Sequence, residues 1–182
     1  MTVMTNLKNI TFKKIRLFNR NAIKVSFKPS FDLIVVHLDD VKEENRIKAI
    51  EDLKHELDTK SVIIAGDFNS IAKSDILHMS EMENEYRKEN PKISEQLGPI
   101  IDEMKVGTTI ELLEGMGFKS AMPNFTPTMP TKKKWHKKPF LKLDHILYKG
   151  DIKIKKVKIL KGSIYDDTSN HYPVVFDIYP LV

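Results

Sequence analysis

Two short, wholly apolar runs constrain the fold of this chain more than any other feature. Residues 33–36 and 62–65 have the length and composition of strands that are buried on both faces of a sheet. Between them, four apolar residues recur at helical spacing: Ile47, Ile50, Leu53 and Leu57. Asp39 or Asp40 is the expected cap of this helix. Strand, helix and strand in this order predict a right-handed parallel crossover, with both strands ending at one edge of the sheet.

The rest of the chain predicts strands at both ends and helices in the middle. The other expected strands cover residues 10–17, 22–27, 143–148, 152–160 and 173–179. Residues 71–116 have a helical pattern that Pro91, Gly98 and Pro99 interrupt. The sum predicts a mixed α/β fold with buried sheets and flanking helices.

The composition is that of one globular domain with a basic surface. Apolar residues make up 41% and charged residues 30%, which excludes disorder and fits a single domain over residues 1–182. The net charge of +5 favours polyanionic partners such as nucleic acid; a lysine-rich surface without a special partner is the alternative. We find no apolar run near the ~18 residues of a transmembrane segment, and no signal-peptide pattern. The absence of cysteine excludes disulfides and thiolate metal sites and fits a cytoplasmic protein.

A polar tetrapeptide, from Gly66 to Asn69, follows the second apolar run. Asp67 and Asn69 are two residues apart, so they point to the same side of an extended segment. A carboxylate and an amide oxygen there can hold a hard cation or orient a phosphate. The alternative is an Asx turn, in which both side chains only satisfy backbone groups.

Three more strand ends carry residues that are typical of catalysis. Asp144 lies in an otherwise apolar strand, where a carboxylate needs a partner. That partner is either a histidine that it orients or a neighbouring lysine. His171, just before the last strand, is well placed as a general acid or base, and His37 ends the first apolar run in a similar way. His145 alternates to the face opposite Asp144, so we do not expect it in the site.

Four ordered segments resemble motifs of the endonuclease/exonuclease/phosphatase superfamily: VVHLDD (35–40), IIAGDFNS (63–70), LDHILYKG (143–150) and TSNHYPVVFDI (168–178). The resemblance covers the chain from Ala22 to the C-terminus. It implies a four-layer αββα sandwich of two mixed sheets, packed face to face and flanked by helices. It also implies Mg²⁺- or Mn²⁺-dependent hydrolysis of phosphodiesters or phosphomonoesters by an activated water.

The resemblance assigns a role to each site residue. Asp67 would position or deprotonate the attacking water, and Asn69 would hold the phosphate and Asp67 in register. Asp144 would orient His171, which would contact the scissile phosphate or act as acid or base. His37 resembles a second active-site histidine of the pancreatic deoxyribonuclease, sphingomyelinase and inositol-phosphatase branches. Abasic-site repair nucleases usually lack this histidine, so repair of abasic sites is disfavoured.

Two departures from the family pattern concern the metal site. The family opens with strands that carry an Asn and then a Gln-Glu pair, whose Glu is the principal metal ligand; neither is found before His37. The chain is therefore expected to lack the first strands of the fold, which would expose apolar sheet edges and favour a homodimer. The last motif usually reads Ser-Asp-His, whereas this chain has Asn170, an uncharged ligand. The candidate metal ligands are Asp67, Asn69 and Asn170.

Two segments carry no family motif. Residues 131–138 hold the densest positive run, where Lys133, Lys134 and Trp135 can neutralise phosphates and stack on a base. The alternative is a solvated loop with Trp135 packed on the core. Residues 74–105 are interpreted as a helical insertion with no assigned role.

These observations leave two functions in competition. The first is a metal-dependent phosphodiesterase or nuclease, whose substrate is nucleic acid or another phosphoester. The second is a catalytically impaired phosphate- or nucleic-acid-binding domain of the same fold. A purely structural partner protein fits poorly with four strand ends that all carry residues suited to catalysis.

Overall fold

The computed structural model describes residues 2–5, 8, 10–27, 30–89, 91–122, 124–131 and 139–180. The strands are β1 (Thr11–Arg16), β2 (Asn21–Phe27), β3 (Phe31–His37), β4 (Val62–Asp67), β5 (Lys119–Ser120), β6 (Asp144–Lys149), β7 (Ile152–Ile159) and β8 (Val174–Pro180). The helices are α1 (Glu43–Leu57), the 3₁₀ helix η1 (Lys73–Asp75), α2 (Ile76–Glu89), α3 (Pro91–Lys105), α4 (Thr108–Gly115) and α6 (Ser163–Thr168). Within these ranges, no helix is long and apolar enough to cross a membrane.

The strands form two sheets of unequal size. The larger sheet has six strands in the order β1-β2-β3-β4-β6-β5, and the smaller sheet consists of β7 and β8. β3 and β4 are parallel, and the other pairs are antiparallel. Helix α1 joins the parallel pair. The strand–helix–strand crossover predicted from the two apolar runs is therefore confirmed.

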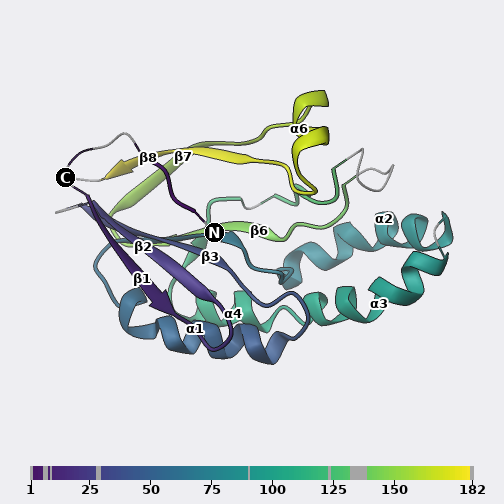
Figure 1. Cartoon of the computed structure of the whole chain (residues 1–182), viewed down its shortest axis with the longest axis horizontal. Coiled ribbons are helices and arrows are strands. Elements are labelled where there is room, and N and C mark those ends of the chain that lie inside the picture. Colours follow the sequence, from purple (N-terminus) through teal and green to yellow (C-terminus); the bar gives the residue numbers. More distant parts are fainter. Residues whose placement is uncertain are drawn as a thin grey trace.

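The six-stranded sheet is covered by helices α1 and α4 on one face and by the small sheet on the other (Figure 1). On the helical face, Ile34 and Ile64 pack against Leu53 of α1, and all three are fully buried. Each such side chain contributes about 1.5–3 kcal/mol by leaving water. On the other face, Ile63 and Ile146 pack with residues of β7 and β8. Because side chains alternate along a strand, the ends of β4 and β6 direct their polar residues to this second face.

Helix α3 corrects one prediction, because it runs without a break through Gly98 and Pro99. Proline lacks an N–H and usually ends a helix. Here tertiary contacts hold the segment. Gly98 lies against the Arg87 guanidinium of α2, where an added Cβ would come within 2.7 Å of Nη1. Arg87 also pairs with Asp102 of α3 at 3.3 Å, so an ion pair joins the two helices near Gly98 and Pro99.

The start of α1 corrects a second prediction. The residue before the helix is Lys42, whose side chain makes no capping hydrogen bond, so neither predicted aspartate is the cap. The Asp39 carboxylate instead accepts the N–H groups of Val41 and Lys42, at 2.9 and 2.7 Å, and shapes the turn before the helix. The N–H of Glu43 donates to the Glu103 carboxylate at 3.0 Å. A residue from α3 therefore satisfies the first helical N–H group.

The predicted sandwich of two mixed sheets is confirmed only in part, because the six-stranded sheet is mixed but the small sheet is antiparallel. Among the described strands, β7 and β8 pair only with each other, so each has one free edge. Large apolar side chains are exposed on both sheets: Phe12 at 53%, Val175 at 42% and Tyr179 at 40%. Free edges beside exposed apolar groups favour association. The homodimer stays a prediction. The interpretation of residues 74–105, which contain α2 and α3, as an insertion also stays a prediction.

Candidate active site

Three neighbouring strands bring three of the predicted site residues into one row. His37 at the end of β3 lies opposite Asp67 at the end of β4, and Asp67 lies opposite Asp144 at the start of β6. The two parallel strands end where the antiparallel third strand begins. The pairing of the apolar runs therefore places an imidazole and two carboxylates side by side.

His171 completes the cluster from the segment before β8. Its Nδ1 donates to Oδ2 of Asp144 at 2.8 Å, because a carboxylate can only accept. Its Nε2 and the Nε2 of His37 each lie 3.7 Å from Oδ2 of Asp67. Asp67 is therefore flanked by two imidazoles, one of which is held by a second carboxylate. The side chains of Asp67 and His171 are 17% and 21% exposed, whereas that of His37 is 53% exposed and faces solvent.

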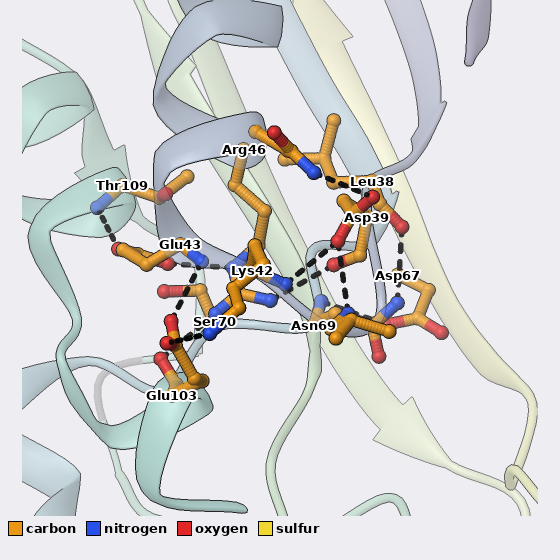
Figure 2. A network of polar contacts seen from close by, with 12 residues as sticks. Leu38, Asp39, Lys42, Glu43, Arg46, Asp67, Asn69, Ser70, Glu103 and Thr109 are labelled. Atoms are coloured by element: carbon orange, nitrogen blue, oxygen red, sulfur yellow. Dashed lines mark hydrogen bonds and ion pairs between the residues drawn. The ribbon is translucent and has the colours of Figure 1, made fainter. Parts of the chain in front are cut away.

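Asn69 holds Asp67 and links two strand ends (Figure 2). Its N–H donates to Oδ1 of Asp67 at 2.9 Å, and its Nδ2 donates to the carbonyl of Leu38 at 3.1 Å. Its φ of 48° is left-handed, a conformation that asparagine tolerates better than most residues. The first bond is the Asx turn considered from the sequence. The second bond fixes the segment after β3, so Asn69 holds Asp67 and the end of β3 in place.

Gly66 allows β4 to approach β3 closely beside the site. Its φ is 136°, and an added Cβ would lie 2.1 Å from the carbonyl oxygen of Val36. We expect Gly66→Ala to lower the free energy of unfolding by about 2–4 kcal/mol, because backbone strain and overlap add.

The matched control for this substitution is Gly117→Ala. Gly117 has a φ of 87°, but nothing lies within 4 Å of an added Cβ. The control therefore carries only the backbone strain, about 1–2 kcal/mol. Urea denaturation of both variants separates the two effects, and equal losses would contradict the close approach at Gly66.

Burial and charge shift the protonation of the two central groups. Desolvation raises the pKa of Asp67, and the negative charge of Asp144 raises it further, against the opposing effect of the two histidines. Burial alone would lower the pKa of His171. The hydrogen bond and charge of Asp144, together with the charge of Asp67, outweigh burial and raise it. The cluster therefore favours an imidazolium beside a carboxyl group that ionises late, a combination typical of acid–base sites.

A buried arginine ties the loop after β3 to helices α1 and α3 (Figure 2). Arg46 is 0% exposed, and its Nε donates to the Glu43 carboxylate at 2.5 Å. Its Nη1 and Nη2 donate to the carbonyls of Asp39 and Glu103, at 2.9 and 2.8 Å. The other oxygen of Glu43 accepts the N–H of Thr109 at 2.6 Å. Arg46 and Glu43 together therefore link the loop after β3, α1, α3 and α4.

The cluster opens into a cleft of about 490 Å³. Its polar side is lined by His37, Asp40, Asp67, Asn69, Asp144, Asn170 and His171. Its apolar side is lined by one face of α3 and by Met129 and Leu141. A larger hollow of about 730 Å³ lies beside β1 and β2 but touches only His37 among the predicted site residues. We therefore assign the chemistry to the smaller cleft.

The predicted site residues have different outcomes. His37, Asp67, Asn69, Asp144 and His171 lie in one cluster, although their catalytic roles stay predictions. Asn170 lines the same cleft, and its carbonyl accepts the N–H of Thr131 at 3.1 Å. The predicted substrate-binding residues Lys133, Lys134 and Trp135 lie outside the described residues.

His145 lies away from the cluster, as its alternation predicted. Its Nε2 is 2.9 Å from the carbonyl oxygen of Ser70, and burial lowers its pKa to about 4.

Sequence reasoning missed the apolar lining from α3. The spacing of Leu97, Ile100, Ile101 and Met104 was the signal that could have found it.

The described residues do not complete a metal site. Across the described ranges, no group of three or more His, Cys, Asp or Glu side chains is placed to hold a metal ion. Asp144 is bonded to His171, and the amide nitrogen of Asn69 is bonded to Leu38. Mg²⁺ is usually held by one or two carboxylates together with waters and substrate phosphates. Asp67 is the only carboxylate among the three predicted ligands, and Mg²⁺ or Mn²⁺ at Asp67, Asn69 and Asn170 stays a prediction.

The sheets and helices match solved structures of the endonuclease/exonuclease/phosphatase fold. No protein-family model matches the sequence, and a search of curated proteins finds no match. The fold recognised from the four sequence motifs is confirmed.

Three solved structures illustrate the match. The inositol polyphosphate 5-phosphatase domain of SpSynaptojanin, in complex with inositol (1,4)-bisphosphate and a calcium ion, has a TM-score of 0.55 and 17% identity, over 94% of this chain and 54% of that chain. An endonuclease/exonuclease/phosphatase from Bacteroides vulgatus has a TM-score of 0.55 and 16% identity, over 88% and 56%. Cimex nitrophorin in a ferrous NO complex has a TM-score of 0.55 and 13% identity, over 95% and 65%.

These matches show the fold and leave the reaction open. The chain spans little more than half the length of the first two structures. The same fold occurs in a phosphatase domain and in a nitrophorin that binds NO. Function must therefore be argued from the site.

Proposed function

We propose that this chain binds a phosphoester in the cleft and hydrolyses it by attack of water. The observation that carries the proposal is the surroundings of Asp67, a largely buried carboxylate 3.7 Å from two imidazoles. One of these imidazoles is held by the second carboxylate, Asp144. This set supplies a base, an oriented acid and positive charge for a phosphoryl group.

Each group has one task in the proposed reaction. Asp67 accepts a proton from the attacking water, and its raised pKa makes it a stronger base than an exposed aspartate. His171 donates the proton on Nε2 to the leaving oxygen as the bond to phosphorus breaks. Asp144 stabilises the imidazolium of His171 and keeps Nε2 directed to the cleft. His37 contacts a phosphoryl oxygen from the open side.

The proposal includes Mg²⁺ or Mn²⁺ as the metal ion of the reaction. Such an ion, when bound, neutralises charge on phosphoryl oxygens. Asp67, Asn69 and Asn170 would hold it, and only Asp67 of these three carries a charge, so weak metal binding is predicted. Cleavage of nucleic acid is one form of the proposal, which the basic residues 132–134 and 137–138 would assist.

The test is hydrolysis of bis-p-nitrophenyl phosphate and of plasmid DNA, with Mg²⁺, Mn²⁺ or EDTA. We expect Asp67→Asn to lower kcat/KM by about 10²-fold, because the base is lost while the shape is kept. Asp177→Asn is the matched control, since Asp177 pairs with Lys156 on the surface of β8. Equal activity of Asp67→Asn and the control would contradict the proposal.

The shortage of metal ligands favours one second candidate, a phosphate-binding domain without catalysis. It predicts that phosphate shifts the NMR signals of His171 while no substrate is turned over. Turnover that Asp67→Asn abolishes excludes this candidate.

A further inference from the structure

One wall of the cleft is apolar and comes from a single face of α3. Leu97, Ile100, Ile101 and Met104 line the cleft and are spaced as i, i+3, i+4 and i+7. Ile101 and Met104 are buried, at 3% and 7% exposure, in a cluster that includes Leu141. Leu97 and Ile100 are only partly buried. The wall is therefore anchored at its base and open towards the cleft.

The wall is held in place by backbone and charged contacts. The carbonyl of Met104 accepts the N–H of Ile71 at 2.9 Å. The Glu103 carboxylate accepts the N–H of Glu43 at 3.0 Å and pairs with Lys42 at 2.8 Å. These bonds tie the end of α3 to the loop after β4 and to the start of α1. The apolar surface is thus formed before any ligand arrives.

The cleft is poor in the charges that a polyanion requires. Among the described residues that line it there is no lysine or arginine, and Asp40 is paired with Arg20 at 2.6 Å. Nucleic acids are held mainly by lysine and arginine contacts to several phosphates. A sugar or glycerol group would leave its hydroxyls against Leu97 and Ile100 without polar partners. A single phosphoryl group joined to an apolar group needs no basic residues for further phosphates and leaves no hydroxyl without a polar partner.

We propose that the cleft takes a phosphoester of an apolar alcohol, whose alkyl or aryl group packs against Leu97 and Ile100. The phosphoryl group then lies at Asp67, His37 and His171, so the inference rests on the proposed function. The apolar group gains affinity by leaving water, and the wall selects it over a polar alcohol. Leu97 and Ile100 are the residues that determine this specificity.

The test is calorimetric binding of three phosphonates, which are not hydrolysed, with Mg²⁺ present: n-hexyl-, 2,3-dihydroxypropyl- and methylphosphonate. We expect the hexyl compound to bind about tenfold more tightly than the other two. Leu97→Ser should remove most of this preference, and a circular dichroism spectrum like that of the wild-type protein shows that the variant is folded. Leu77→Ser is the matched control, because Leu77 lies on α2 and is 82% exposed.

Each failure has its own signature. Equal binding of all three phosphonates to the wild-type protein would overturn the inference and leave the proposed function standing. Methylphosphonate that does not bind, or that binds His171→Ala equally well, would overturn the proposed function and the inference with it. A single-stranded oligonucleotide that binds more tightly than hexylphosphonate, and so displaces it at a concentration below that of hexylphosphonate, would overturn the preference for an apolar group.

Discussion

Replacing Arg46 with methionine is expected to lower the free energy of unfolding by about 3–5 kcal/mol. Arg46 is 0% exposed and donates to the Glu43 carboxylate and to two backbone carbonyls. Methionine keeps part of the apolar stem but leaves the 4%-exposed Glu43 without its cation. An unpaired buried charge is the costly product of breaking such a pair. Urea denaturation followed by circular dichroism measures the loss.

Two further variants show whether the unpaired charge is the cause. Lys48→Met is the matched control on the same helix, since Lys48 pairs with Glu44 at the surface, where ion pairs contribute less than about 1 kcal/mol. Adding Glu43→Gln to Arg46→Met should recover part of the lost stability, because the stranded charge is removed. A double variant no more stable than Arg46→Met would contradict this account.

The parts of the fold that were predictable depend on local pattern. The apolar runs at residues 33–36 and 62–65 identified β3 and β4, and their parallel pairing set the row of His37 and Asp67. A run of apolar residues reports burial on both faces, whatever the rest of the chain does. The strand containing Asp144 was found for the same reason.

The parts that were not predictable depend on contacts between distant segments. Arg46 meets Glu103 across 57 residues, and Glu43 meets Thr109 across 66. Local sequence carries no sign of such pairs. Contacts with α2 likewise hold α3 together at Pro99. The short helix α6 has no side-chain cap from which the sequence could have predicted it.

The candidate site shows the same division. The sequence placed Asp67, Asn69, Asp144 and His171 at strand ends. It left a histidine or a lysine as the partner of Asp144, and the 2.8 Å bond to His171 shows the histidine. It offered a cation or phosphate site, or an Asx turn, for Asp67 and Asn69. The bond from the Asn69 N–H to Asp67 is that of the turn, and the functional roles of both residues stay predictions. Only the three-dimensional packing reveals that α3 supplies the facing wall.

His171→Ala is expected to lower kcat/KM for phosphoester hydrolysis by about 10²–10⁴-fold, because the leaving oxygen loses its proton donor. His55→Ala is the control, since His55 lies on the exposed face of α1. Because Asp144 and Asp67 raise the pKa of His171, activity in the wild-type protein should persist above pH ~6.5 and fall as that pKa is passed. An unchanged rate in His171→Ala would remove His171 from the mechanism.

Asp144→Asn tests whether the carboxylate acts through His171. Asparagine removes the negative charge that raises the pKa of His171, so the alkaline fall in kcat/KM should move to lower pH. The raised pKa of His171 also contributes to the free energy of unfolding. This contribution is fully present below the unfolded pKa of about 6.5, and it is lost as the pH rises through the folded pKa. The loss of stability in Asp144→Asn should therefore be larger near pH ~6 than near pH ~9. A purely structural role for Asp144 would lower stability equally at both and leave the pH profile in place.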